Sequence, residues 1–306
     1  MAIDENLNEL AGMPVRDYEP GSGLPDAAAA AWRLRRQPGG PPFVDGVVRP
    51  FLAEPGVPSV RALVIGAWTD NPVEDSSTVL AELTLHAYRF PALRALFLGD
   101  VTEDECPISL IRHGDVGVVA TSFPGLEEYW IRGSAEMKVP PLAWRSLRRL
   151  TIESGGLPST VVRNVAASAL PLLEHLELWL GSEGSGGDAT MADLRPVLDG
   201  QAFPLLRRLG LRNAGIADEV AAALAKAPVA ARLEELDLSL GTLGDEGVLA
   251  LLRGQPLERL SFLDLHHHYL SEDGMAQVRA SGLGVDLSDR QDEVDGERYV
   301  AVGELR

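Results

Sequence analysis

The chain has a single cysteine, an excess of acidic over basic residues and no long hydrophobic run. Cys106 is the one cysteine among 306 residues, so neither an internal disulfide framework nor a multi-cysteine metal site can form. No run reaches the roughly 18 apolar residues that a membrane-spanning helix needs, and the N-terminus lacks the pattern of a signal peptide. These absences predict a soluble, cytoplasmic protein.

Positive charge is scarce, and this limits the classes of partner. The chain has 27 Lys and Arg against 45 Asp and Glu, a formal net charge of −18. Such a field repels phosphate backbones and anionic lipids, so the composition argues against nucleic-acid and membrane-surface binding. It accommodates a basic protein or peptide, although acidity that only keeps the protein soluble remains the alternative.

Familiar catalytic motifs are also absent. The sequence contains no G-x-S-x-G, H-E-x-x-H, C-x-x-C or G-x-G-x-x-G motif. We therefore expect a protein that is not an enzyme and that carries no cofactor.

One pattern recurs eight times between residues 60 and 265, at intervals of 21 to 33 residues. It consists of an apolar residue, two others, a second apolar residue, one other and a third apolar residue. The copies are Val60-Leu63-Ile65, Leu93-Leu96-Leu98, Leu126-Tyr129-Ile131, Leu147-Leu150-Ile152, Leu173-Leu176-Leu178, Leu206-Leu209-Leu211, Leu233-Leu236-Leu238 and Leu260-Leu263-Leu265. The second and third apolar positions lie two apart, so they share one face of a strand. Stacking such strands side by side joins these faces into one core.

Segments between these copies read as amphipathic helices. Residues 159–168, 218–225, 245–253 and 271–280 each begin with a small polar or acidic residue, and Thr190 to Asp193 fits a capping box. Strands on one side and wider helices on the other must bend the stack. The pattern predicts an α/β solenoid with a parallel concave sheet and convex helices.

The repeats resemble the leucine-rich-repeat superfamily, in particular its helix-bearing, ribonuclease-inhibitor-like cytoplasmic branch. Residues 233–247, LEELDLSLGTLGDEG, match that branch most closely. Residues 176–181, 187–190 and 263–271 also resemble an uncharacterised family of actinobacterial repeat proteins. The superfamily resemblance implies a horseshoe arc that binds other proteins. The chain departs from it by lacking the usual Asn or Cys three residues after the third apolar position.

The pattern also predicts how the chain is divided. Residues 1–59 form an N-terminal capping region with a helix around residues 43–53, residues 60–287 form about eight repeats, and residues 288–306 form a C-terminal cap or tail. Residues 285–287 read as a ninth, abbreviated strand, and residues 298–302 as a closing edge strand. We expect a monomer.

The strand register selects the side chains that face a partner. Positions between the second and third apolar residues, and those just after the third, point to the concave side. The candidate partner-binding residues are Phe97, Trp130, Arg132, Glu177, Trp179, Arg212, Asp237, Asp264, His266 and Asp286.

Each group within this set has an alternative explanation. The aromatic residues are suited to a protein interface, but a cap or a neighbouring strand would also explain them. The carboxylates of Asp237, Asp264 and Asp286 are stacked on adjacent strands, so their mutual repulsion must be compensated by positive charge. This charge could come from Arg208 and Arg212, from a basic partner or from a bound divalent cation. Residues 266–268 are three histidines, but neighbouring strand residues point to opposite faces, so satisfied turn histidines are an alternative to a metal site.

The sequence therefore favours a non-catalytic module that binds a protein or peptide, a basic one included, on its concave face. One alternative is a regulatory subunit of an enzyme complex; some superfamily members activate GTPases, which would allow Arg132 or Arg212 to act in trans. The other is a metal-dependent activity at Asp264 and His266.

Overall fold

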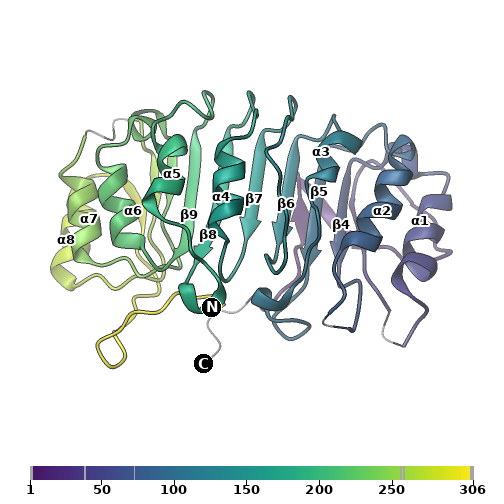
Figure 1. Ribbon diagram of the computed structural model, residues 1–306, viewed down its shortest axis with the longest axis horizontal. Coiled ribbons are helices and arrows are strands. Elements are labelled where there is room, and N and C mark those ends of the chain that lie inside the picture. Colours follow the sequence, from purple (N-terminus) through teal and green to yellow (C-terminus); the bar gives the residue numbers. More distant parts are fainter. Residues whose placement is uncertain (1–2, 38, 72, 256, 258, 304–306) are drawn as a thin grey trace.

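The fold is an open array of strands and helices that follow one another in chain order (Figure 1). The computed structural model describes residues 3–37, 39–71, 73–255, 257 and 259–303. Within them lies a 12-stranded sheet in which β1 pairs with β2 antiparallel and every later pairing is parallel. The strands are β1 (Glu9–Leu10), β2 (Met13–Asp17), β3 (Ala31–Leu34), β4 (Ala62–Gly66), β5 (Ala95–Asp100), β6 (Glu128–Arg132), β7 (Arg149–Glu153), β8 (His175–Gly181), β9 (Arg208–Ala214), β10 (Glu235–Asp237), β11 (Phe262–Asp264) and β12 (Gly284–Asp286).

The helices cover one face of this sheet (Figure 1). They are α1 (Arg49–Ala53), α2 (Ser77–Leu85), α3 (Val118–Ser122), α4 (Ser159–Ala166), α5 (Met191–Leu198), α6 (Ala217–Leu224), α7 (Asp245–Leu252) and α8 (Glu272–Ala280). The capping box predicted at Thr190 and Asp193 begins α5, and the Ser271 hydroxyl accepts a hydrogen bond from the Gly274 amide at the start of α8. Among the described residues no helix combines the length and apolar character needed to cross a membrane.

A single hydrophobic spine runs along the array. The second apolar residue of each repeat pairs in register with that of the next: Leu63, Leu96, Tyr129, Leu150, Leu176, Leu209, Leu236, Leu263 and Val285. All but Val285 are at most 1% exposed. This confirms the predicted leucine-rich-repeat architecture, including the abbreviated ninth strand.

The parallel sheet starts well before residue 60, the predicted start of the repeats. β2 and β3 continue the pairing on the N-terminal side, and Trp32 occupies the spine position beside Leu63. A short π-helix over Val44–Val48 leads into α1, in agreement with the helix predicted there. Residues 1–59, predicted as a capping region, therefore contribute strands to the sheet.

The N-terminal hairpin of β1 and β2 covers part of the sheet face opposite the helices. Ala11 and Gly12 turn the chain with φ of 51° and 72°, a conformation that favours glycine. Leu10 and Met13 then pack in one cluster with Val64 and Phe97. This second cluster is separate from the spine, and it closes one half of the concave face.

Residues 298–302 do not form the predicted edge strand. Residues 294–303, which we call the return segment, run back below the strand ends towards the middle of the array (yellow in Figure 1). The backbone of this segment bonds at the strand ends of successive repeats: the Ala301 amide donates to the Leu240 carbonyl in the turn after β10, and the Val302 amide donates to the side-chain Oδ1 of Asn213 near the end of β9. The segment is thus held without pairing as a strand of the sheet.

Candidate functional site

The concave face is the side of the sheet opposite the helices, and the ten predicted residues lie along it in register. Phe97 pairs with Trp130, and Trp179 pairs with Arg212. Asp237, Asp264 and Asp286 follow one another on β10, β11 and β12. These residues share one side of the sheet, but they differ greatly in accessibility.

Phe97 is the clearest departure from the expected surface. Its side chain is fully buried, because the N-terminal hairpin covers it, and it stacks on Trp130 with ring centroids 4.6 Å apart. Trp130 itself is half-buried. Phe97 therefore fits the alternative explanation, in which a cap covers the aromatic residues. Its ring is not accessible to a partner in this structure.

Arg132 is also withdrawn from the surface. It is 5% exposed, its Nε donates to Glu153 Oε2 over 2.6 Å, and a second nitrogen donates to the Val101 carbonyl over 3.1 Å. Burial raises the pKa of Glu153, and the adjacent Arg132 opposes that rise. The guanidinium compensates a buried carboxylate, so it does not reach outward as a residue acting in trans would.

Trp179, Glu177 and Arg212 form one interlocked group near the middle of the array. Trp179 is 5% exposed, its Nε1 donates to Glu177 Oε1 over 2.7 Å, and the Arg212 guanidinium lies 4.9 Å from its ring centroid. Arg212 also lies 3.0 Å from Glu177 and 3.2 Å from Asp237. Burial disfavours the Glu177 carboxylate, but hydrogen bonds from His175 and Trp179 and the charge of Arg212 outweigh it and lower the pKa to about 2. Arg212 thus provides the offset predicted for Asp237.

The carboxylate row, Asp237, Asp264 and Asp286, is only partly compensated. Burial raises the pKa of Asp237, although Arg212 lies beside it. Asp264 Oδ1 lies 2.7 Å from His266 Nδ1, and this hydrogen bond raises the pKa of the imidazole. Potential ligand atoms of Asp264, His266 and Asp286 all lie within 4.8 Å of one another, a donor set that a divalent ion can use.

His267 and His268 fit the alternative explanation, in which the ring nitrogens of turn histidines find hydrogen-bond partners within the chain. His267 Nδ1 lies 3.3 Å from Asp289, and His268, fully buried, accepts a hydrogen bond from the Leu270 amide. Burial lowers the pKa of both imidazoles. His266 is the member of this run that faces the concave side.

A hollow of about 180 Å³ opens in the C-terminal half of the face, which we call the Gly210 hollow. Its lining comes from β8 to β11: His175, Glu177, Arg208, Leu209, Gly210, Glu235, Leu236, Asp237, Phe262 and Asp264. Phe262 is 41% exposed, so it presents an aromatic ring to solvent there. This hollow brings together Glu177, Asp237 and Asp264 from the predicted set.

Sequence reasoning missed Phe262 and Glu235 as surface residues, and it named Arg208 as an offset for the carboxylate row, whereas Arg208 pairs with Glu235. All three residues have one property in common. They immediately precede the second apolar residue of their repeats and so have the same alternation as the positions that were considered. Extending the two-residue alternation to the position before the second apolar residue of each repeat would have identified them.

Towards the strand starts, paired charges alternate from strand to strand. β6 and the residue before it carry Glu127 and Glu128, whereas the next strand carries Arg148 and Arg149 in the same places. Arg149 lies 3.5 Å from Glu128, and farther along Arg208 lies 3.1 Å from Glu235. This part of the face is therefore neutralised within the chain.

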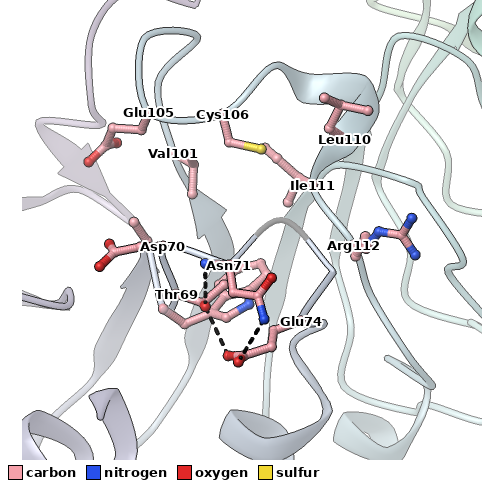
Figure 2. Close-up of a pocket in the computed structure, with 12 residues that line it drawn as sticks. Thr69, Asp70, Asn71, Glu74, Val101, Glu105, Cys106, Leu110, Ile111 and Arg112 are labelled. Carbon is pink, nitrogen blue, oxygen red and sulfur yellow. Dashed lines mark hydrogen bonds between the residues drawn. The ribbon is translucent and has the colours of Figure 1, made fainter. Parts of the chain in front are cut away.

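A smaller pocket of about 100 Å³ lies away from the concave site, at the ends of β4 and β5 (Figure 2). The Thr69 hydroxyl donates to Glu74 over 2.8 Å, and Asn71 Nδ2 donates to the same carboxylate over 3.2 Å (Figure 2). Cys106 lines another wall, and burial followed by the charge of Glu103 raises the pKa of its thiol. A raised pKa favours the neutral thiol, which is a weaker nucleophile than the thiolate.

Comparison with known proteins identifies one informative relative. No protein-family model and no curated protein matches the chain. A crystal structure of an internalin from Listeria monocytogenes covers 76% of this chain and 73% of its own at 14% identity, but its TM-score of 0.28 carries no weight. A crystal structure of a protein from Bacteroides fragilis is 31% identical, with a TM-score of 0.75, and the match covers 79% of this chain and 69% of that one. The chain, a leucine-rich-repeat array by its own topology, therefore belongs to the same family as this Bacteroides fragilis protein.

Proposed function

We propose that this protein is a non-catalytic recognition module that binds a protein or peptide partner on the C-terminal half of its concave face. The partner is basic, and the module acts as a monomer in the cytoplasm. The narrower resemblance to actinobacterial repeat proteins remains a prediction.

One observation carries the proposal: the two halves of the concave face differ in accessibility. The N-terminal half is covered by the chain's own hairpin, with Phe97 fully buried beneath it. The C-terminal half keeps Phe262 exposed beside half-buried Asp237 and Asp264. An exposed aromatic residue within an acidic surface is suited to recognition of a basic protein, since aromatic residues supply much of the binding energy at interfaces.

The test is capture of a partner from the source cells by the purified protein and its variants. We expect Phe262→Ala and Glu235→Lys to lose the captured partner, because they remove the aromatic contact and reverse a charge at the hollow. Glu246→Lys is the matched control, since Glu246 is exposed on α7, away from the sheet face. Retention of the partner by both concave variants would contradict the proposal, provided that circular dichroism shows them folded.

Regulation of a GTPase by an arginine acting in trans has little support. Arg132 is buried against Glu153, and Arg212 is engaged with Glu177 and Asp237. Both guanidiniums would have to give up charged partners to reach another protein.

A divalent-ion site is the second candidate, and the cluster of Asp264, His266 and Asp286 favours it. Carboxylate oxygen and imidazole nitrogen suit zinc, although three donors leave a coordination position for solvent. Zinc should then raise the melting temperature of the wild-type protein and not that of Asp286→Asn. Equal melting temperatures with zinc and with a chelator would exclude this function.

A further inference from the structure

The Gly210 hollow lies where one side chain is missing from a row of carboxylates. Gly210 pairs in register with Glu177 on β8 and with Asp237 on β10, and Asp237 pairs with Asp264 on β11. The neighbouring positions thus carry acids while this one carries no side chain. The main chain at Gly210 forms a buried floor, with the Glu177 and Arg212 side chains beside it.

Negative charge exceeds positive charge around this floor. Four carboxylates line the hollow: Glu177, Glu235, Asp237 and Asp264. Two guanidiniums lie beside them, because Arg208 lies 3.1 Å from Glu235, and Arg212 contacts both Glu177 and Asp237. The His175 imidazole also lines the hollow and lies 3.4 Å from Glu177. Within the described part of the chain, the cationic partner of Asp264 is the His266 imidazole. The hollow is therefore complementary to one additional positive group.

Phe262 supplies an apolar wall next to this charge. It pairs in register with Glu235, lines the hollow and is 41% exposed. An aromatic face attracts a cation and also packs against the methylene groups that carry it. At about 180 Å³, the hollow is smaller than the roughly 300 to 1,000 Å³ typical of small-molecule pockets, so its size suits one long side chain.

We propose that the Gly210 hollow receives a single arginine side chain of a protein partner. The guanidinium lies between the carboxylates of Asp237 and Asp264, and the aliphatic part lies along Phe262. Arginine fits better than lysine because its planar group donates to two carboxylates at once and also stacks on an aromatic ring. This inference rests on the proposed recognition function and names the chemistry that the concave face selects.

The test uses the full chain and a defined probe, Nα-acetyl-arginine amide, followed by NMR of the backbone amides. We expect saturable shifts of the Gly210, Asp237 and Asp264 amides. Nα-acetyl-citrulline amide has nearly the same shape without the charge, and it should bind at least ten-fold more weakly. Equal titrations by the two probes would overturn the proposal, because the hollow would then recognise shape without charge.

Gly210→Leu fills the hollow without changing any charge. A Cβ atom at this position would lie 2.9 Å from Glu177 Cγ, so the larger side chain occupies the space and displaces the Glu177 side chain from Trp179 and Arg212. We expect it to abolish the arginine-dependent shifts. The matched control is Gly184→Leu, because Gly184 is exposed and a Cβ there would meet nothing closer than 3.9 Å. Persistent shifts in a folded Gly210→Leu variant would also overturn the proposal.

Two further variants keep the test informative if Gly210→Leu fails to fold. Asp237→Asn preserves shape and removes one carboxylate charge, and it should weaken the probe at least five-fold. Phe262→Leu removes the aromatic face and should weaken it about three-fold. Unchanged affinity in both would overturn the proposal. If the partner is still captured when the hollow is filled by Gly210→Leu, recognition by the concave face stands and the arginine site alone is refuted.

Discussion

Replacing Phe97 with alanine tests whether this aromatic residue stabilises the closed half of the concave face. The side chain is fully buried between the sheet and the N-terminal hairpin, so the whole ring is lost from a packed environment. Such substitutions cost about 3 to 5 kcal/mol of unfolding free energy. The stack with Trp130, with centroids 4.6 Å apart, accounts for about 0.5 to 1.5 kcal/mol of that cost.

Urea unfolding at 25 °C, followed by far-ultraviolet circular dichroism, measures this loss. Trp130 should also become more solvated in Phe97→Ala, which shifts its fluorescence to longer wavelength. Tyr88→Ala is the control, because Tyr88 is 77% exposed and its loss should change stability by no more than about 0.5 kcal/mol. A loss below about 1 kcal/mol in Phe97→Ala would refute the reasoning, since a ring that faces solvent costs no more than the control.

Three further predictions concern buried groups elsewhere in the array. Burial lowers the pKa of His113 from 6.5 to about 4, so the unfolded chain takes up a proton first as the pH falls, and stability should drop by about 3 kcal/mol between pH 7 and pH 4. Urea titrations at several pH values should show that His113→Gln loses this share of the slope; an unchanged slope would contradict the assignment. Asn213→Ala removes two hydrogen bonds to Val302 and one to Ser154 and should cost about 3 kcal/mol, whereas a cost close to zero would mean that the return segment is not held there. Gly181→Ala should lower the melting temperature by many degrees, because its φ is 71° and a Cβ would lie 1.9 Å from the Gly155 carbonyl oxygen, whereas Gly184→Ala should not; equal melting temperatures would contradict this close approach.

The repeat architecture followed from the sequence because the spine residues are large and aliphatic at a fixed spacing. Leu96, Leu150, Leu209 and Leu263 all occupy the shared spine that their pattern required. Alternation along a strand also determined which side chains are directed towards the concave side. Both are local properties, and short-range periodicity records them.

Accessibility on that face did not follow from the sequence, because it depends on segments that lie outside the repeats. Nothing in the alternation around Phe97 indicates that Leu10, far away in the sequence, packs over it. The return segment was misassigned for the same reason, since it is held by the side chain of Asn213 in β9 and does not pair with the backbone of an edge strand. The strand register of Phe262 could be read from the sequence. It was overlooked because only the positions after the second apolar residue of each repeat were considered.

The return segment has a mechanical consequence. In most repeat arrays each unit touches only its neighbours, so tension at one end unravels the last unit first. Here the Asn213 side chain and Val302 are joined across 89 positions of the chain, with β10, β11 and β12 lying in the stretch between them. A pull on Gly303 therefore loads its hydrogen bonds from the Ser109 and Ser185 hydroxyls, and then the bonds between Val302 and Asn213, before it loads β12. The array should then unfold abruptly under force, because β12 is loaded only after the hydrogen bonds of the return segment have broken.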